Sequence, residues 1–297
     1  MNRTQFRIQT DIWLKYVFKA SGLLCIAVLL GIFGMLCYNT VAFFTQISPL
    51  DFITATQWSP SHTIKTSIYG LLPLLVSTLL VTMGAMLLAV PLGIATALFM
   101  SEYAGDSIKK ILKPTVEMLA AIPSVVIGFL GIVVISPLIS KVLGLSNGLN
   151  ALNGAILLAI MALPTIITVS EDAIFAVPNS LKEASLGLGA SRWQTLRQII
   201  LPAASPGIIA AVMLGMGRAI GETMTVLMAT GNSLAFPNGF FDSIRTITAT
   251  IAIEMGEVPY KTTHYYALFA IAFVLFLFTM LVNIVAERAA NNIRKFQ

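Results

Sequence analysis

Two ionisable residues, Arg218 and Glu222, lie four positions apart inside a long apolar stretch of the sequence. At membrane depth each would cost about 3 kcal/mol or more unless it were paired or hydrated. On one helix the two side chains would share a face and could neutralise each other. A guanidinium also offers a planar fork of donors that matches phosphate or sulfate, and a neighbouring carboxylate would keep it from holding such an anion too tightly. The pair therefore has two interpretations, an oxyanion relay and an internal ion pair that only locks two helices together.

A helix that crosses the membrane must hold this pair, and the predicted span is 203–230. At 1.5 Å per residue, Arg218 lies about 22 Å from the start of that span, past the middle of a hydrocarbon core roughly 30 Å thick. Thr223 and Thr225 follow in the same segment. We include both threonines with the charged pair as candidate residues of a substrate pathway.

The composition of the chain predicts a membrane protein. Hydrophobic residues make up 57% of the 297 positions and charged residues only 10%, a ratio that one water-soluble core of this size cannot hide. Six apolar stretches are each long enough to span a bilayer at about 20 residues per helix. We expect an all-α polytopic membrane protein with six transmembrane helices at roughly Ala20–Phe44, Leu71–Met100, Thr115–Ser140, Asn153–Ser170, Ala203–Thr230 and His264–Ala286.

The basic residues indicate the orientation of these spans. The net charge is +5, and most Lys and Arg residues fall before the first span, after the second and fourth, and at the C-terminus. With an even number of spans these positions share one side, so the positive-inside rule places both termini in the cytoplasm. The charge needs no nucleic-acid partner to explain it. The predicted organisation is a cytoplasmic segment, a first helix with an external loop, a transmembrane core and a cytoplasmic tail, at 1–19, 20–70, 71–286 and 287–297.

A second pattern lies in the loop 171–202 on the cytoplasmic side of the core. It reads Glu183-Ala184-Ser185, three residues, Gly189, nine residues, then Ile199-x-Leu201-Pro202. Prolines bracket the pattern, Ser180 can cap a helix with Glu183 at the capping-box position, and glycines allow a tight turn. The loop is therefore predicted to form a short helix, a turn and a second short helix.

The second of these short helices is predicted to begin at Ser191. Its residues divide between two faces, with Arg192 and Arg197 toward solvent and Trp193, Leu196 and Ile200 on the opposite face. An ordinary amphipathic helix hairpin at the membrane surface is the alternative interpretation of the loop.

The spacing in this loop resembles the EAA loop of ABC importer permeases, the helix pair by which a membrane subunit rests in a cleft of a separate ATPase. Ser185 stands where that family often has Ala. The chain contains no G-x-x-x-x-G-K-[ST] pattern, so ATP hydrolysis is expected in another subunit and this chain is not expected to be an enzyme. The resemblance implies the type I ABC importer permease fold. It assigns ATPase coupling to Glu183, Ala184, Gly189, Ile199, Leu201 and Pro202.

Around Arg218 the resemblance becomes narrower. The segment from Arg218 to Met228 resembles the signature of phosphate ABC transporter permeases, and 224–232 favours the PstC-type subunit over its PstA-type partner. The resemblance implies a location in the cytoplasmic membrane of a bacterium or archaeon, surrounded by lipid, with no cofactor. The implied protein partners are a second homologous permease subunit of the PstA type, a cytoplasmic ATPase dimer and an extracytoplasmic phosphate-binding protein.

The longest external segment is 231–263. Its isoleucines alternate with threonines, and its polarity is too high for a full span, so we expect a short helix that lies in or dips into the membrane. His62 and His264 have no Cys or His at ligand spacing, so no metal site is expected.

Two other functions remain open at this point. A permease of the same class could carry another oxyanion, such as sulfate or molybdate. An ion-driven secondary transporter could instead relay protons through Glu222 and Glu117. The spacing of the EAA-like loop argues against the secondary transporter, because a carrier driven by an ion gradient needs no ATPase dock.

Overall fold

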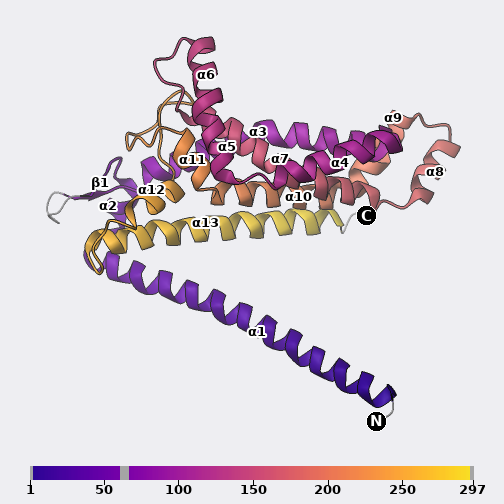
Figure 1. Cartoon of the computed structure of the whole chain (residues 1–297), viewed down its shortest axis with the longest axis horizontal. Helices are drawn as coiled ribbons and strands as arrows, with labels where there is room; N and C mark the ends of the chain where they lie inside the picture. Colours follow the sequence, from indigo (N-terminus) through magenta and orange to yellow (C-terminus); the bar gives the residue numbers. More distant parts are fainter. Residues whose placement is uncertain (1–2, 61–66, 295–297) are drawn as a thin grey trace.

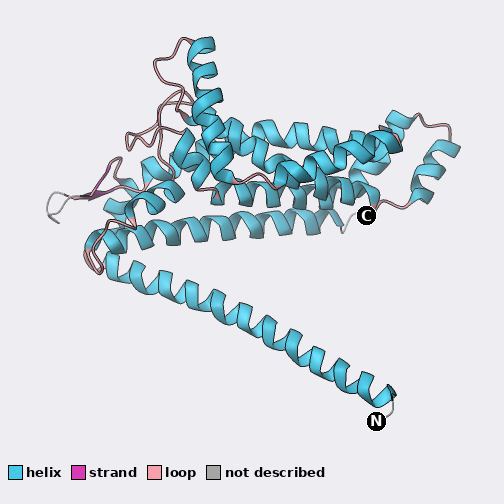
Figure 2. Cartoon of the chain, viewed as in Figure 1, coloured by secondary structure: helices cyan, strands magenta, loops and turns pink. Residues whose placement is uncertain are grey.

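The computed structural model describes residues 3–60 and 67–294, and Figure 1 shows a bundle of helices from which one long helix diverges. Six helical stretches are long and apolar enough to cross a membrane, which confirms the predicted all-α polytopic architecture (Figure 2). They are Trp13–Phe44, Leu72–Tyr103, Ser124–Leu143, Ala151–Phe175, Arg192–Gly221 and Thr263–Arg288. His62 and the outermost residues of the predicted terminal segments lie outside the described residues.

Most of the helices follow one another with short connections, and the longest connections lead from α2 to α3 and from α11 to α12. The α-helices are α1 (Arg3–Phe44), α2 (Pro49–Thr54), α3 (Leu72–Leu98), α4 (Asp106–Ala120), α5 (Ser124–Leu130), α6 (Ser136–Leu143), α7 (Ala151–Phe175), α8 (Asn179–Gly187), α9 (Arg192–Thr195), α10 (Leu201–Gly221), α11 (Met224–Ala229), α12 (Ile247–Glu254) and α13 (Thr263–Arg294). The π-helical segments are η2 (Phe99–Tyr103), η3 (Gly131–Ile135) and η4 (Leu196–Ile200). Strands β1 (Trp58–Ser59) and β2 (Ile68–Tyr69) form an antiparallel pair with Trp58 opposite Tyr69.

The third span starts later than predicted because a separate helix, α4, precedes it. α4 ends at Ala120, and the chain turns before Pro123, the residue from which α5 begins. Every residue of α4 is at least partly exposed. The helix contains both lysines and apolar residues, a composition typical of an amphipathic helix. Glu117, the second candidate for a proton relay, is exposed on α4 and therefore lies outside the third span.

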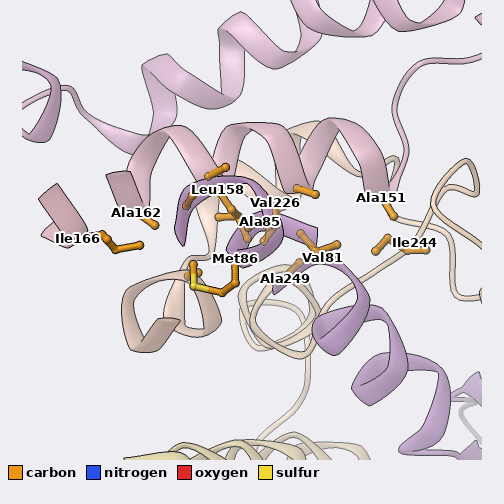
Figure 3. Packing of buried hydrophobic residues seen from close by; sticks show 14 residues of the cluster. Val81, Ala85, Met86, Ala151, Leu158, Ala162, Ile166, Val226, Ile244 and Ala249 are labelled. Carbon is orange, nitrogen blue, oxygen red and sulfur yellow. The ribbon is translucent and has the colours of Figure 1, made fainter. Parts of the chain in front are cut away.

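The centre of the bundle is formed by α3, α7 and α10, and both α3 and α10 pack along α7. Figure 3 shows buried residues from these elements and from α11, among them Val81, Leu158 and Val226. The approach of α10 to α7 depends on a small residue, since a Cβ added at Gly215 would lie 2.6 Å from Ile166 Cγ1. That distance is well inside carbon–carbon contact at about 3.5–4.0 Å. This close contact fixes the last turns of α10 beside α7.

The first span stands apart from the rest of the bundle. α1 meets α13 through Phe33, whose ring centroid lies 6.1 Å from that of Phe273 and 5.7 Å from that of Phe276. Toward its N-terminal end α1 diverges, and apolar side chains such as Trp13 and Leu24 are exposed. Figure 1 shows that α1 begins, and α13 ends, at the same end of the molecule as α8 and α9.

The opposite end of the molecule carries α2, the strand pair and α12 (Figure 1). An apolar cluster there joins the end of α1 to the start of α13, and Phe43 and Phe52 meet in it edge to face at 5.2 Å. Within the predicted external segment 231–263, the short helix is α12. Its residues Ile247–Thr250 are buried in the protein, so α12 lies inside the bundle end rather than on its surface.

Candidate functional site

The fifth span ends at Gly221, so Arg218 and Glu222 do not share one helix. Glu222 has φ −69° and ψ 133°, an extended conformation, and α11 begins two residues later. Within the described part of the chain no ion pair joins the two side chains. The prediction that they neutralise each other on one helical face is therefore wrong. One physical reason is that the Glu222 carboxylate serves the next helix: its Oε1 accepts a hydrogen bond from the backbone N–H of Thr225 at 3.3 Å.

Arg218 lies beside the middle of α7. Its Nη1 donates to Thr165 Oγ1 at 3.5 Å, and Thr165 is about 21 Å from the start and about 15 Å from the end of α7 at 1.5 Å per residue. The arginine side chain is exposed on the surface of this chain. A permanently charged group is thus presented near the middle of the membrane-spanning bundle, with a hydroxyl as its partner among the described residues.

The break between α10 and α11 is held by hydrogen bonds from other elements. The backbone carbonyl of Glu222 accepts from Thr248 Oγ1 of α12 at 2.8 Å. Thr223 is half-buried, and its hydroxyl donates to the Gly221 carbonyl at 3.4 Å. Thr225 is buried, and its hydroxyl donates to the Ser124 carbonyl at 3.1 Å, which ties α11 to the start of α5. Of the four candidate pathway residues, Arg218 is exposed, Glu222 and Thr223 are half-buried, and Thr225 is buried.

The loop 171–202 folds as the expected helix, turn and helix. Gly189 lies in the turn with φ +87°, a left-handed conformation that glycine adopts at no steric cost. The second helix begins with a capping box, in which Ser191 Oγ accepts from the Gln194 N–H at 3.2 Å and Gln194 Oε1 accepts from the Ser191 N–H at 2.7 Å. The expected cap at Ser180 is wrong, because α8 already begins behind Pro178 and Ser180 lies within its first turn.

A hydroxyl pair joins the two short helices, since Ser185 Oγ and Thr195 Oγ1 lie 2.9 Å apart. The apolar face predicted for the second helix forms only in part. Leu196 and Ile200 are buried as expected, but Trp193 is 61% exposed and was wrongly placed with them. Trp193 lies three positions before the buried Leu196 of η4.

The predicted coupling residues divide between the tip and the base of this helix pair. Glu183, Ala184 and Gly189 are exposed at the tip, where Leu188 is 90% exposed. The base is formed by residues that join the pair to α10, namely Ile199, Leu201 and Pro202. Ile199 and Pro202 line a cavity of about 630 Å³ between the helix pair and α10. The exposed tip presents apolar and charged side chains, among them Leu188 and Glu183, away from the membrane-spanning bundle.

One ion pair connects this helix pair to the second span, and another connects α4 to α7. Lys182 of α8 pairs with Glu102 of η2, at the end of the second span. Lys113 of α4 pairs with Glu171 of α7, with Nζ 3.7 Å from Oε2. No spacing in the sequence relates these partners, which lie 80 and 58 positions apart, and sequence reasoning missed both glutamates. The Lys182–Glu102 pair therefore ties α8 to the end of the second span.

At the other end of the molecule, one carboxylate collects three donors. Glu254 of α12 accepts from Arg245 Nη1 at 3.0 Å and from Trp58 Nε1 at 3.0 Å, and its Oε2 lies 2.8 Å from His264 Nε2. Tyr69 packs against Trp58, and burial raises the pKa of the Tyr69 hydroxyl. A cavity of about 620 Å³ opens beside Tyr69, Glu254 and His264. We call Glu254 and its three donors the external hub.

The described residues hold no group of three His, Cys, Asp or Glu side chains that could bind a metal ion. His264 is used by the external hub, where its ring nitrogen contacts a carboxylate. The hub was not found from sequence, because its members come from four separate segments and follow no common spacing.

Sequence comparison places this architecture in a known group. The family described as binding-protein-dependent transport system inner membrane component matches residues 89–295. A probable ABC transporter permease protein, YqgH of Bacillus subtilis, is 39% identical over 267 residues, which cover 89% of this chain and 84% of the relative. The phosphate transport system permease protein PstC of Haemophilus influenzae is 32% identical over 93% of this chain and 92% of the relative. PstC of Mesorhizobium japonicum is 33% identical over 80% and 77%.

Solved structures share the fold. A chain of a bacterial ABC transporter involved in the import of alginate superposes with a TM-score of 0.64 at 17% identity, covering 98% of this chain and 99% of that chain. A chain of the MetNI methionine ABC transporter in an inward-facing conformation gives a TM-score of 0.56 at 19% identity, covering 74% and 93%. The expected type I ABC importer permease fold is thereby confirmed. The chain belongs to the family of binding-protein-dependent transport system inner membrane components, and it is a multi-pass transport subunit of the inner membrane.

Proposed function

We propose that the chain is the PstC-type permease subunit of an ATP-driven importer of inorganic phosphate and forms half of its translocation pathway. Relatives that align over most of the chain carry the name phosphate transport system permease protein PstC. The observation in the structure that favours an anion is Arg218, an exposed guanidinium beside the middle of α7. Its planar donors match phosphate oxygens in a way that a lysine or a hydroxyl would not.

The surroundings of Arg218 favour a hydrated pathway over lipid. An unpaired arginine facing hydrocarbon is strongly unfavourable, and irregular backbone at membrane depth is tolerated only where it is buried in protein or lines a water-filled cavity. Both features occur together here, because the extended residue Glu222 follows α10 directly. The surface that carries Arg218 and Glu222 is therefore suited to face a second subunit across a water-filled path.

Three kinds of protein partner follow from this role. The exposed tip around Gly189 is suited to the cleft of a cytoplasmic ATPase, which would supply the energy. A second homologous permease subunit of the PstA type would complete the pathway and cover apolar surface along α1, where side chains such as Leu24 are exposed. An extracytoplasmic phosphate-binding protein would deliver the anion at the end of the molecule that carries the external hub.

Uptake of labelled phosphate tests this function. Cells that lack the chain are expected to take up little phosphate at micromolar concentrations, and re-expression of the chain with its ATPase and partner subunits should restore uptake. Labelled sulfate and molybdate, measured in the same cells, separate phosphate from the other oxyanions. Restoration of sulfate or molybdate uptake without phosphate uptake would overturn the assignment, and uptake that survives ATP depletion but not collapse of the proton gradient would favour a secondary transporter.

The orientation of the chain is a further prediction, with both termini and the loop 171–202 in the cytoplasm. We expect cysteines introduced at Ser191 and Asn238 to differ in labelling in intact cells. Both positions are exposed, and the turn between α8 and α9 lies at the opposite end of the molecule from the loop between α11 and α12 (Figure 1). An impermeant thiol reagent should label position 238 and spare position 191 in a chain whose Cys25 and Cys37 are replaced by Ser. Labelling of position 191 alone would reverse the topology, and permeabilised cells, in which both should react, provide the control.

A further inference from the structure

Helix α12 connects the external hub to the break between α10 and α11. Near its first residue, Thr248 Oγ1 donates to the backbone carbonyl of Glu222 at 2.8 Å. At its last residue, the Glu254 carboxylate accepts from the hub donors. One short rigid element therefore touches the candidate pathway at one end and the external surface at the other.

The hydrogen bond from Thr248 satisfies a backbone carbonyl that has no partner within a helix, that of Glu222. Glu222 follows the last helical residue of α10, where backbone carbonyls have lost their partners within the helix. Thr248 is 9% exposed, and α12 is anchored beside it by the Ile247 N–H, which donates to Thr78 Oγ1 of α3 at 3.0 Å. The position of the Glu222 backbone therefore depends on where α12 sits against α3.

The contact at the second end is also largely enclosed, since the Glu254 side chain is 12% exposed and that of Arg245 is 16% exposed. The donors to Glu254 come from the strand pair, from the loop before α12 and from the start of α13. A charged carboxylate with this set of donors holds its position more strongly than one with neutral partners in water. The hub thus fixes the outer end of α12 to three neighbouring segments.

A second route joins the hub to the far end of α11. Arg245 Nε donates to the Asn232 carbonyl at 3.1 Å, and Asn232 Nδ2 donates to the Leu227 carbonyl at 2.7 Å. Asn232 has φ +55°, a conformation that asparagine tolerates better than most residues. The start of α11 is bound by the Glu222 carboxylate through the Thr225 N–H. One end of α11 is therefore linked to the hub through Asn232 and Arg245, and the other end is linked to α12 through Glu222 and Thr248.

We propose that Thr248 and Glu254 are positioning residues that set the conformation of the α10–α11 break, so that events at the external surface are passed to Glu222 through α12. The proposal rests on the proposed transport function for its physiological meaning. Neither side chain needs to touch the anion. Thr248 acts through the Glu222 carbonyl, and Glu254 acts through the position of α12 and through Arg245.

Substitution of Thr248 tests the inner contact. Thr248→Val keeps the shape of the side chain and removes the donor to the Glu222 carbonyl, so we expect phosphate uptake to fall about tenfold at a normal protein level because the break between α10 and α11 loses this contact. Thr248→Ser restores the hydroxyl and should restore most of the uptake. Thr250→Val is the matched control, because Thr250 is buried in the same helix but its hydroxyl binds the Thr246 carbonyl within that helix; it should transport at close to the wild-type rate.

Substitution of Glu254 tests the outer contact and its coupling to the inner one. Glu254→Gln should lower uptake about tenfold, whereas Glu257→Gln, the same chemical change at an exposed neighbour, should not. If both substitutions act by changing the position of α12, phosphate uptake in the double variant Thr248→Val/Glu254→Gln should be little lower than in either single variant. Independent defects would multiply to about a hundredfold loss.

The position of the break can be measured without transport. In a chain with Cys25 and Cys37 replaced by Ser, a cysteine introduced at Thr223 is expected to react with a small thiol reagent at a rate that Thr248→Val and Glu254→Gln each change severalfold. Thr250→Val and Glu257→Gln should leave that rate unchanged. Equal rates in all five chains, or multiplicative losses of uptake in the double variant, would overturn the positioning role. If even the wild-type chain imported no phosphate, the proposed function would fail, and the labelling rates would still decide this proposal.

Discussion

Replacing Gly189 by valine is expected to reduce ATP-driven uptake to near background while leaving the chain in the membrane. Gly189 has φ +87°, and a left-handed conformation costs a residue with a Cβ about 1–2 kcal/mol, with the β-branched residues the least tolerant. A Cβ added at Gly189 would meet open space among the described residues, so the strain arises in the backbone and not from a clash. The turn should relax, and α8 and α9 should lose the relative orientation that presents their tip to the ATPase.

Two variants separate this effect from a general loss of small residues. Gly187→Val introduces the same side chain two positions earlier, at the helical end of α8 and also toward open space, and it should transport at close to the wild-type rate. Gly189→Asn should retain most of the uptake, because asparagine enters the left-handed region more readily. The measurements are uptake, copurification of the ATPase and transport-coupled ATP hydrolysis. A Gly189→Val complex that purifies intact with normal coupled hydrolysis would remove the docking role.

Replacing Arg218 by glutamine is expected to lower phosphate uptake by about 10- to 100-fold. The change removes a charged, bidentate donor, and hydrogen bonds to charged groups are worth about 1.5–3 kcal/mol. Arg218→Lys should recover only part of the rate, because an ammonium keeps the charge but not the planar fork. Arg288→Gln is a suitable control, since Arg288 is an exposed arginine near the end of α13, and it should have little effect.

The companion change, Glu222→Gln, separates the charge of Glu222 from its role in the helix break. A glutamine oxygen can still accept the Thr225 N–H, so the start of α11 should survive while the negative charge is lost. We expect uptake to fall about tenfold or more because the arginine then releases the anion slowly. Near-normal uptake in Glu222→Gln together with loss in Glu222→Ala would show that the carboxylate acts only as a cap.

The double variant tests the ion-pair interpretation directly. Because Arg218 and Glu222, both of which the structure describes, form no ion pair, removal of both charges should not restore transport, and the Arg218→Gln/Glu222→Gln chain is expected to assemble normally and remain inactive. A purely structural pair predicts the opposite result, since removing both charges would relieve an imbalance that either single change creates. Phosphate uptake near the wild-type rate in the double variant would therefore refute the role of these residues in the pathway.

The features that the sequence determined are those set by local physics. Bilayer thickness requires about 20 apolar residues per helix, so six spans can be counted from hydropathy alone, and the structure contains six. The turn at Gly189 and the start of α9 at Ser191 also depend on neighbouring residues only, through backbone conformation and a capping box. For the same reason the spacing of the EAA-like loop predicted its helix pair correctly.

The tertiary structure alone decided where the fifth span stops and what surrounds the charges within it. Because the apolar run continues past Gly221, hydropathy predicted a helix that runs through Glu222 to Thr230, whereas α10 ends at Gly221. The chain leaves the helix at Glu222 because its carbonyl and carboxylate are bound by Thr248 and Thr225, and Thr248 is 26 residues away. The external hub depends on partners as far apart as Trp58 and Glu254. Contacts of this kind follow no sequence period, since the packing of α12 against α3 and α13 brings their donors and acceptors together, and only the folded chain reveals them.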